Sequence, residues 1–496
     1  MQTLLLPNDM RAGEARYFEC AGIRSIDAME RAATALADAV RKMVPAGSRV
    51  VFVCGNGRNG GDGLACARIL KDEYSTQIVL PRPPRSEDAV QNLERAKQAG
   101  VPISEEVDQL PDLWVDALFG TGLSREPDGI YACWIDRMNA DKTVPILAAD
   151  IPSGLNGATG RAYAHCVHAS RTITFGFGKT GLYLQDGFDM CGTVQVANIG
   201  FPETYFSPAV WMTEKKDLTE LLPKRNRRNT YKNLFGHLLI VAGSFGMAGA
   251  AALCARSAMR TGVGLVTIAC PESIVPILQT LVPGAMCLPI AEKDGAIADA
   301  EAVQRAFAGK TAVAIGCGLS TRANPEFVKA VLQSNLPAVI DADAINLIAE
   351  NGFHKLLRPH HVITPHPGEA RRLLKSVGDS DELLADPIAV VRTLNGLGAC
   401  ALFKGASCVI SDSQNTYLSA SGCSGMSCAG SGDVLTGIIG ALLADVSDSD
   451  RKPALCAALG SEIHGLAGEL AQKKRGVRGM IAEDLPECIA EVLHEC

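Results

Sequence analysis

The stretch VVFVCGNGRNGGDGLACARIL, residues 50–70, decides the fold of the first half of the chain. Its β-branched and apolar start, 50–54, predicts a buried strand that runs into a loop of five glycines and then into a helix, which we expect to begin near Asp62. Glycines let the backbone turn tightly and approach a ligand, and the free N–H groups at a helix start favour an anion. The loop therefore predicts a phosphate-binding site.

The same loop contains the pattern GxGxxG at 55–60, which is shared with dinucleotide-binding folds. The pattern alone is weak evidence, because a redox Rossmann site needs an acid at the end of the next strand. Here the strand expected at 77–80 leads to Arg82, so such a site is disfavoured, although Arg82 or Arg85 would tolerate a 2′-phosphate. A glycine turn that only connects strand to helix is the alternative, but five glycines with Asn59 and Asp62 favour binding.

Short apolar runs alternate with helical patterns along the whole chain. An amphipathic helix is predicted over 25–42, where apolar residues recur at steps of three and four. Further strands are predicted at 114–119, 146–151, 172–177, 237–241, 265–269, 312–315, 338–340, 362–364 and 399–403. This alternation indicates βαβ units with a mainly parallel sheet, and we expect a Rossmann-like three-layer domain followed by a second α/β domain. The basic, aperiodic segment 221–233 is the expected boundary, read as a solvated linker or, alternatively, as a phosphate contact.

Composition limits the class of protein. The 496 residues are 47% hydrophobic and 20% charged, which is typical of an ordinary soluble globular protein rather than a disordered or fibrous one. With a net charge of −7, no general field attracts nucleic acid or anionic lipid, so we expect neither as a partner. The 17 cysteines show no CxxC pair, and the start has no secretory pattern, so we expect a cytoplasmic protein without disulfides. HCVH at 165–168 has too few ligands for a closed metal site, and a structural role is favoured.

Two more loops follow predicted strands in the first half. VDALFGTGLSRE, 115–126, and ADIPSGLNG, 149–157, each place an aspartate, Asp116 or Asp150, beside glycines and hydroxyl residues. Taken singly, each aspartate is equally well explained as a loop or cap residue. Parallel strands bring their carboxyl ends to one edge, where ligands bind in open α/β sheets. Three such loops on one edge therefore indicate a site.

The second half has a comparable loop. GCSGMSCAGSGDVLTGIIGALL, 422–443, passes from small residues into an apolar helix from about Asp433, where the backbone N–H groups form an anion hole. Asp433 lies where a base would meet a phosphoryl-accepting hydroxyl, although taken alone it is equally well explained as an N-cap. Other motifs lie at predicted strand ends and favour a site, namely GSF at 243, GCGLS at 316, DADAIN at 341, TPHPGE at 364 with His366, and KGAS at 404.

The motifs of residues 1–212 together resemble the epimerase domain of the NAD(P)H-hydrate repair enzymes. They are MRAGEARYFECAGI, MERAA, GNGRNGGDG, VDALFGTGLSRE and ADIPSG. The resemblance implies interconversion of R- and S-NADHX and NADPHX, which are nicotinamide cofactors hydrated at C6, with Asp150 as the acid–base group. It implies that Asn59, Asp116 and Ser153 surround K⁺. The implied substrate contacts are Arg58, Asn59, Gly60, Gly61, Asp62, Gly120, Thr121, Gly122, Leu123, Ser124, Arg125, Glu126 and Asp150.

The motifs of residues 225–496 resemble the dehydratase domain of the same enzymes, which has a ribokinase-like fold. Their order, RTGVGLVTIA, GCGLS, DADAIN, VITPHPGEA, KGAS and GSGDVLTG, matches as well. The resemblance implies that ADP, with Mg²⁺, phosphorylates the C6 hydroxyl of the S epimer and that phosphate is then lost, leaving AMP and NAD(P)H. It implies Asp433 as the base. The implied contacts are Val263, Gly318, His366 and Asp433 for the hydrate and Lys404, Gly405, Ala406, Ser407, Cys408 and Gly432 for the nucleotide.

These readings predict a bifunctional enzyme, an isomerase over 1–213 and a lyase over 225–496, which we expect to form a homo-oligomer. The chain departs from the family pattern at Arg58, Ala149, 231–233, Cys408 and 423–424. The alternative is a ribokinase-like small-molecule kinase fused to a non-catalytic binding domain. Recovery of reduced nicotinamide from its hydrate distinguishes the two.

Overall fold

A computed structural model describes residues 1–208, 210–447 and 452–496. The chain divides into two compact units. The N-terminal unit is Thr3–Val210, and the C-terminal unit is Trp211–Cys496 together with the first two residues, Met1–Gln2. Over the described residues, none of the helices combines the length and the apolar character that crossing a membrane requires.

The N-terminal unit is built on a parallel sheet. Its strands run in the order β4-β3-β2-β5-β6-β7-β9, and each neighbouring pair is parallel. The strands are β2 (Arg49–Cys54), β3 (Ser75–Val79), β4 (Ile103–Ser104), β5 (Leu113–Ala117), β6 (Ile146–Ala149), β7 (Arg171–Phe175) and β9 (Thr193–Ala197). The α/β class and the parallel strands predicted from the alternation are confirmed. A shorter parallel pair, β1 (Gln2–Leu5) with β8 (Gly178–Lys179), lies apart from this order.

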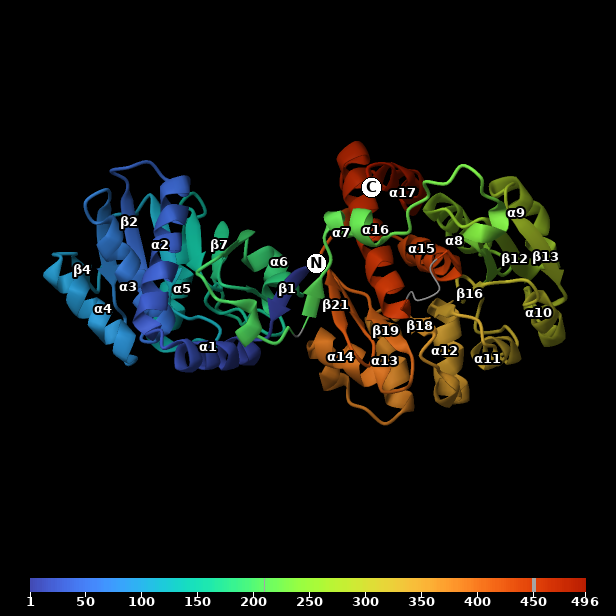
Figure 1. Cartoon of the computed structure of the whole chain (residues 1–496), viewed down its shortest axis with the longest axis horizontal. Helices are drawn as coiled ribbons and strands as arrows, with labels where there is room; N and C mark the ends of the chain where they lie inside the picture. The colour runs from blue at the N-terminus through green and yellow to red at the C-terminus, as the bar shows by residue number, and fades with distance from the viewer. Residues whose placement is uncertain (209, 448–451) are drawn as a thin grey trace. The chain divides into compact units, whose positions relative to one another are not determined.

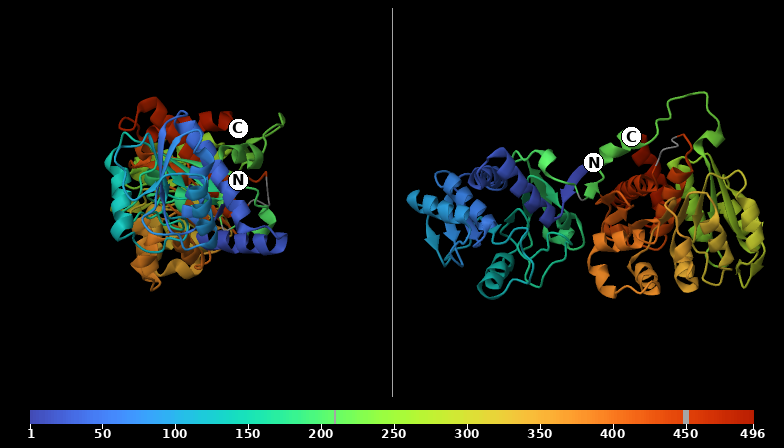
Figure 2. Two further views of the ribbon diagram at one scale, coloured as in Figure 1. Left: turned by 90° about the vertical axis from the view of Figure 1, so that its left-hand side faces the viewer. Right: turned by 60° about the horizontal axis from the view of Figure 1, so that its bottom comes forward.

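Helices cover both faces of this sheet (Figures 1 and 2). Because side chains alternate along a strand, Phe52 packs with one helical layer and Val53 with the other. The first layer is α2 (Ser25–Met43), α3 (Arg58–Leu70) and α4 (Glu87–Gln98), and the second is α5 (Gly129–Ala140). The remaining helices of the unit are α1 (Pro7–Ala21) and α6 (Gly187–Met190). The unit therefore has three layers, as expected.

Helix α3 begins at Arg58, four residues before the start expected near Asp62. Glycines are poor helix formers, so the sequence favoured a longer loop. The structure shows what overrides that preference: a Cβ on Gly61 would lie 2.7 Å from the Met29 sulfur, and one on Gly63 would lie 2.6 Å from Ala117. The glycines let α3 pack closely on α2 and on the sheet, so residues 58–61 form its first turn.

Replacing Gly55 by Ala is expected to lower the free energy of unfolding of the N-terminal unit by about 3 kcal/mol. A Cβ there would lie 1.8 Å from the Leu118 carbonyl oxygen, a backbone atom that cannot move aside without shifting β5. Gly57→Ala is the matched control in the same loop, because its Cβ would meet no described atom within 4 Å. Urea denaturation followed by circular dichroism measures both variants. Equal stability of the two would contradict this account of the loop.

The C-terminal unit is built on a second, mainly parallel sheet. Its order is β13-β12-β11-β16-β17-β18-β19-β20-β21-β10, with β20 antiparallel to β19 and to β21. The strands are β10 (Val210–Met212), β11 (His237–Val241), β12 (Leu265–Pro271), β13 (Met286–Ile290), β16 (Ala312–Ile315), β17 (Ala338–Ile340), β18 (His361–Ile363), β19 (Cys400–Phe403), β20 (Cys408–Ser411) and β21 (Thr416–Ser419). A separate hairpin joins β14 (Glu292–Lys293) to β15 (Ala296–Ile297). The strands predicted in this half are confirmed.

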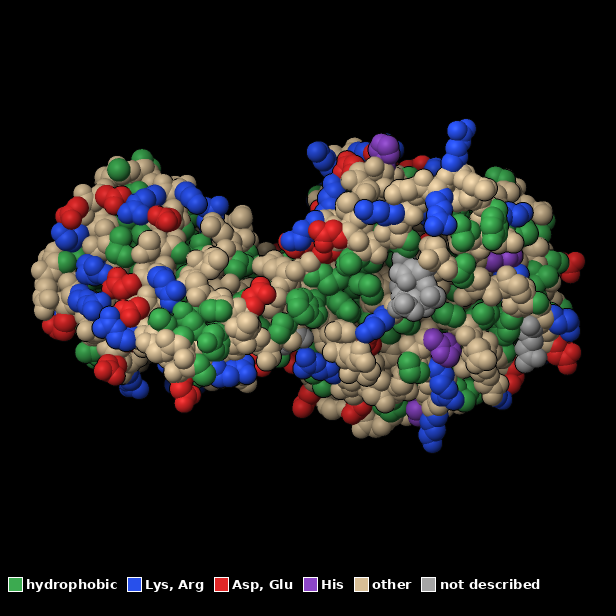
Figure 3. Space-filling model, in the orientation of Figure 1, with side chains coloured by type: hydrophobic (Ala, Val, Ile, Leu, Met, Phe, Trp, Pro, Cys, Tyr) green, Lys and Arg blue, Asp and Glu red, His purple; other side chains and the backbone are tan. Residues whose placement is uncertain are grey.

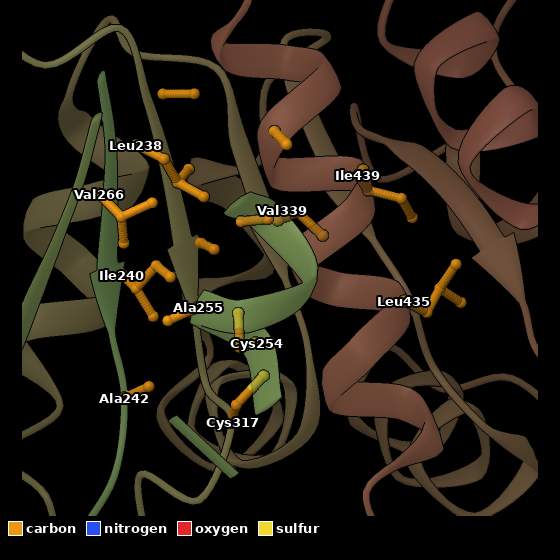
Figure 4. Packing of buried hydrophobic residues seen from close by; sticks show 14 of the residues in the cluster. Leu238, Ile240, Ala242, Cys254, Ala255, Val266, Cys317, Val339, Leu435 and Ile439 are labelled. Atoms are coloured by element: carbon orange, nitrogen blue, oxygen red, sulfur yellow. The ribbon is translucent and has the colours of Figure 1, made fainter. Parts of the chain in front are cut away.

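Helices lie on both sides of this sheet as well, α8, α15 and α16 on one side and α11 to α14 on the other (Figure 1). The helices are α7 (Lys215–Leu221), α8 (Ala248–Thr261), α9 (Val275–Leu281), α10 (Ala300–Ala306), α11 (Glu326–Gln333), α12 (Ala342–Asn351), α13 (Pro367–Ser376), α14 (Pro387–Asn395), α15 (Ser431–Ala444), α16 (Pro453–Arg475) and α17 (Leu485–His494). Figure 4 shows Leu238 and Ile240 of β11 packed with Val266 of β12 and with α8 and α15. The helix that carries Asp433 is therefore fixed on a buried core.

The division between the units falls at Val210/Trp211, before the basic segment 221–233. Trp211 pairs with Tyr417 between β10 and β21, and Leu218 of α7 is buried in the C-terminal core. These contacts are tertiary, so the sequence alone does not show which unit receives this segment.

On the face that Figure 3 presents, acidic and basic side chains are interspersed.

Candidate active sites

A cavity of about 600 Å³ opens at the carboxyl ends of β2, β5 and β6 in the N-terminal unit. It is lined by most of the residues predicted to contact substrate, which are Arg58, Asn59, Asp62, Gly120, Thr121, Gly122, Leu123, Ser124, Arg125 and Asp150. Gly60, Gly61 and Glu126 lie outside the lining, and the first two are packing residues. A cavity of this size suits a small-molecule ligand, and its polar edge coincides with the start of α3.

Asp150 lies directly after β6 with a φ of 66°, a left-handed conformation that is uncommon outside glycine. Such strain is typically retained where function requires a side chain to point in one direction. Its Oδ1 accepts hydrogen bonds from Lys179 Nζ at 2.6 Å and from Thr174 Oγ1 at 3.1 Å. The carboxylate is thus held in place at the cavity wall.

Lys179 is a site residue that the sequence reasoning missed. Its side chain is only 1% exposed, and its ammonium also donates to Thr174 Oγ1 at 2.9 Å and to the Phe175 carbonyl at 2.8 Å. All three donors are therefore used, and the positive charge faces Asp150. The only signal in the sequence was a lysine just beyond the strand predicted at 172–177, and pairing across 29 residues is not visible there.

Of the three residues predicted to surround potassium, Asn59 lines the cavity, and Asp116 and Ser153 lie behind its wall. Asp116 is fully buried, and its Oδ1 accepts from Ser153 Oγ at 2.6 Å while its Oδ2 accepts from Ser153 N at 2.7 Å. Asn59 Nδ2 donates to the Phe119 carbonyl at 2.9 Å, and the Phe119 amide donates to Ser153 Oγ at 2.9 Å. Burial raises the pKa of Asp116 to about 6, although the Ser153 hydrogen bonds oppose the shift. Hydrogen bonds therefore connect Asn59 to Ser153 through the Phe119 backbone, and Ser153 in turn to Asp116.

In the C-terminal unit Asp433 lies in the first turn of α15, which begins at Ser431. Burial, and then the nearby charge of Asp341, raise the pKa of Asp433 to about 6. A carboxylate with this pKa is ionised at neutral pH and accepts a proton more readily than an exposed aspartate. Asp433 is therefore suited to act as a general base.

Asp341, from the motif DADAIN, anchors a buried network next to Asp433. Its Oδ1 accepts from Lys404 Nζ at 2.6 Å and from Thr364 Oγ1 at 2.8 Å, and its Oδ2 accepts from Thr436 Oγ1 at 2.8 Å. Burial alone would raise the pKa of Asp341, but Lys404 and these hydroxyls hold it below its usual value. The predicted nucleotide residue Lys404 is thus fixed by an acid to which the sequence reasoning assigned no role.

The structure places the other residues predicted for this half in three ways. A Cβ on Gly432 would lie 3.5 Å from Lys404 Nζ, so these two residues meet Asp341 at the carboxyl edge of the sheet. Gly405, Ala406 and Ser407 follow Lys404 in the turn to β20, which begins at Cys408. His366 caps α13, its Nδ1 accepting from Gly368 N at 2.9 Å, and Gly318 with φ 58° lies against Met247. Val263 precedes β12 and packs in the core at the opposite edge, so the structure does not bring it to the others.

Comparisons with known proteins match both units. A family model described as YjeF-related protein N-terminus matches residues 25–181, and one described as NAD(P)H-hydrate dehydratase matches residues 238–491. A "Bifunctional NAD(P)H-hydrate repair enzyme Nnr" of Moorella thermoacetica is 35% identical over 95% of this chain and 93% of its own. Another protein with this name, from Coxiella burnetii, is 34% identical over 94% of each chain.

A solved structure of an ADP/ATP-dependent NAD(P)H-hydrate dehydratase from Bacillus subtilis is 25% identical with a TM-score of 0.48. It is matched over 58% of this chain and 98% of its own.

Proposed function

Because this chain belongs to the family of bifunctional NAD(P)H-hydrate repair enzymes, we propose that it restores hydrated nicotinamide cofactors in two steps, one in each unit. The N-terminal unit interconverts the R and S epimers of NADHX and NADPHX, and the C-terminal unit dehydrates the S epimer with ADP. One observation carries the proposal: each unit places a lysine-bound aspartate at the carboxyl edge of its own parallel sheet, Asp150 with Lys179 and Asp341 with Lys404. The products are NAD(P)H, AMP and phosphate.

In the N-terminal site Asp150 is the group that moves a proton during inversion at C6. Hydrogen bonds from Lys179 and Thr174 hold one of its oxygens, so the carboxylate keeps one orientation at the cavity wall. The start of α3 and the loop 120–126 would bind the pyrophosphate and ribose, because backbone N–H groups and the cationic Arg58 and Arg125 line this end of the cavity. Binding there would bring the damaged ring to Asp150.

A potassium ion fits Asn59 at the cavity wall together with Asp116 and Ser153 behind it. The Oδ1 of Asn59 is buried and has no hydrogen-bond partner among the described residues, so it is an oxygen donor that is free for a cation. Asp116 and Ser153 add carboxylate and hydroxyl oxygens of the same kind. When bound, K⁺ would neutralise the buried Asp116 charge and fix the Phe119 segment of the cavity wall.

In the C-terminal site Asp433 takes the proton of the C6 hydroxyl while that oxygen attacks the β-phosphorus of ADP and AMP leaves. The phosphate ester then loses phosphate from C6 and a proton from C5, which restores the ring double bond. Lys404 and the amides around Gly432 would bind the nucleotide phosphates, with Gly405, Ala406, Ser407 and Cys408 along the adenylate. Gly318 and His366 would contact the hydrate.

Magnesium fits this edge through two carboxylates. Ligand atoms of Asp341, Asp433 and Cys317 lie within 4.8 Å of one another, and the carboxylates, unlike the thiol, suit a hard cation. When bound, Mg²⁺ would neutralise charge on the transferred phosphoryl group. The cytoplasmic location, the homo-oligomeric state and the restriction to small-molecule substrates all stay predictions from the sequence.

The proposal is tested by incubating the purified full chain with (S)-NADHX. Absorbance of reduced nicotinamide is expected to return with ADP and not without it, and AMP is expected to appear in equal amount. Formation of a stable phosphorylated product without NADH would instead support the kinase alternative.

The dehydratase activity is expected to fall tenfold per pH unit below about pH 6. Asp433 must be ionised to accept a proton, and its raised pKa places the loss of the ionised form at that pH. The ADP phosphates also titrate, so the control is Asp343→Asn, which removes a negative charge that raises the pKa of Asp433. The midpoint should move to lower pH in this variant. A midpoint common to both proteins would assign the titration to ADP rather than to Asp433.

A further inference from the structure

Helix α1 brings a further carboxyl group, that of Glu14, to the cavity that Asp62, Asp88 and Asp150 also line. Met10 and Tyr17 are buried on one face of α1, and Glu14, one turn after Met10, lines the cavity from the same helix. Gly13 packs so closely that a Cβ there would lie 2.1 Å from the Phe206 ring, which fixes α1 against the unit. Glu14 belongs to the motif MRAGEARYFECAGI, which the proposed function leaves without a role.

The charges around Glu14 leave it without a strong cation partner. The charged groups that face it are Arg11 on its own helix, Arg58 and Asp62 on α3, Asp150 after β6 and Lys179 on β8. Arg58 approaches to 3.5 Å, but its side chain is 63% exposed, so the interaction is screened by solvent. Lys179 already uses its three donors on Asp150, Thr174 and Phe175.

Glu14 and Asp150 therefore lie in different environments within one cavity. Burial raises the pKa of Glu14 above its usual value, and Lys179 only partly offsets this. Asp150, by contrast, is bound directly by the Lys179 ammonium at 2.6 Å. When two titratable groups in one site differ in this way, one is suited to act as the acid and the other as the base.

We propose that Glu14 is the second acid–base residue of the epimerisation and that it protonates the C6 hydroxyl group while Asp150 deprotonates the incoming water. This inference rests on the proposed function. The geometry that carries it is the placement of Glu14 and Asp150 on different elements of one cavity, with Lys179 committed to Asp150.

The step balances without an oxidant. The lone pair of the ring nitrogen forms a C=N bond to C6, the C6–O bond breaks, and the hydroxyl leaves as water with the proton of Glu14. A second water then adds to the other face of C6, the C=N electrons return to nitrogen, and the proton of this water passes to Asp150. The two carboxyl groups exchange roles for the reverse inversion or are reset by proton exchange with solvent.

The first test is Glu14→Gln in the full chain, with (R)-NADHX and no ADP, so that only epimerisation is observed by separating the epimers. We expect kcat to fall at least 100-fold, with little change in KM and with unchanged dehydration of (S)-NADHX. Glu19→Gln, an exposed residue on the same helix, is the matched control and should retain full activity. Glu14→Asp should recover part of the loss, because a shorter carboxyl still donates a proton.

The second test is epimerisation in H₂¹⁸O. The wild-type chain should place ¹⁸O at C6 in each inversion. Activity of Glu14→Gln within threefold of wild type, inversion without ¹⁸O, or a loss in Asp62→Asn with none in Glu14→Gln would each overturn the proposal. If the wild-type chain itself does not interconvert the epimers, the proposed function fails instead, so the two failures are distinguishable.

Discussion

The Asp433→Asn variant is expected to lose dehydration of (S)-NADHX by about 1000-fold while epimerisation in the N-terminal unit continues at the wild-type rate. Asn has nearly the same shape and keeps the first turn of α15, but it cannot take the proton of the C6 hydroxyl. The loss should therefore appear mainly in kcat, with ADP binding largely retained because Lys404, Gly432 and Asp341 are unchanged and the Asn carbonyl oxygen is still a ligand for Mg²⁺. NADH formation measured by absorbance gives kcat and KM.

Asp379→Asn is the control for this variant, since Asp379 is an exposed acid of the same unit. It should leave both activities unchanged. Dehydration by Asp433→Asn within tenfold of wild type would remove Asp433 from the reaction and leave it as a residue of the helix start.

The Asp150→Asn variant is expected to lose R-to-S conversion by a similar factor, about 1000-fold, and to keep dehydration of the S epimer. Asn tolerates the positive φ at this position, so the backbone should be retained. The buried Lys179 charge would lose its counterion, so we also expect the N-terminal unit to lose about 3 kcal/mol of stability. Chromatography of the epimers measures the rate, and urea denaturation measures the stability.

Asp108→Asn, at an exposed acid of the same unit, should change neither quantity. A stability loss with normal epimerisation would show that Asp150 is needed for folding rather than for proton transfer.

The elements of the fold were largely accessible from the sequence, because strand and helix periods and glycine loops are local signals. The strand predicted at 50–54 and the helix predicted at 25–42 agree with β2 and α2 within a few residues. The start of α3 was misplaced because the tight contacts of Gly61 and Gly63 outweigh the low helix propensity of glycine. That competition depends on residues from α2 and β5, which no local pattern shows.

The site was accessible only in part, for the same reason. Asp150 directly follows a strand and Asp433 lies in the first turn of a helix. Their motifs therefore placed both residues at the edge of a sheet where ligands bind. Lys179, Glu14 and the role of Asp341 in holding Lys404 depend on contacts between distant segments. Val263 shows the converse: it belongs to a matching motif, yet it precedes β12 and lies at the other edge of the sheet.

Complementation tests most directly whether each unit contains its own complete site. Asp150→Asn and Asp433→Asn chains are mixed with (R)-NADHX and ADP, and NADH formation is compared with each variant alone and with buffer. Asp433→Asn alone should form almost no NADH, and Asp150→Asn alone should form NADH only as fast as (R)-NADHX epimerises in buffer. The mixture should exceed both rates, because one chain supplies (S)-NADHX to the other. No NADH from the mixture, with both variants folded, would contradict two independent sites.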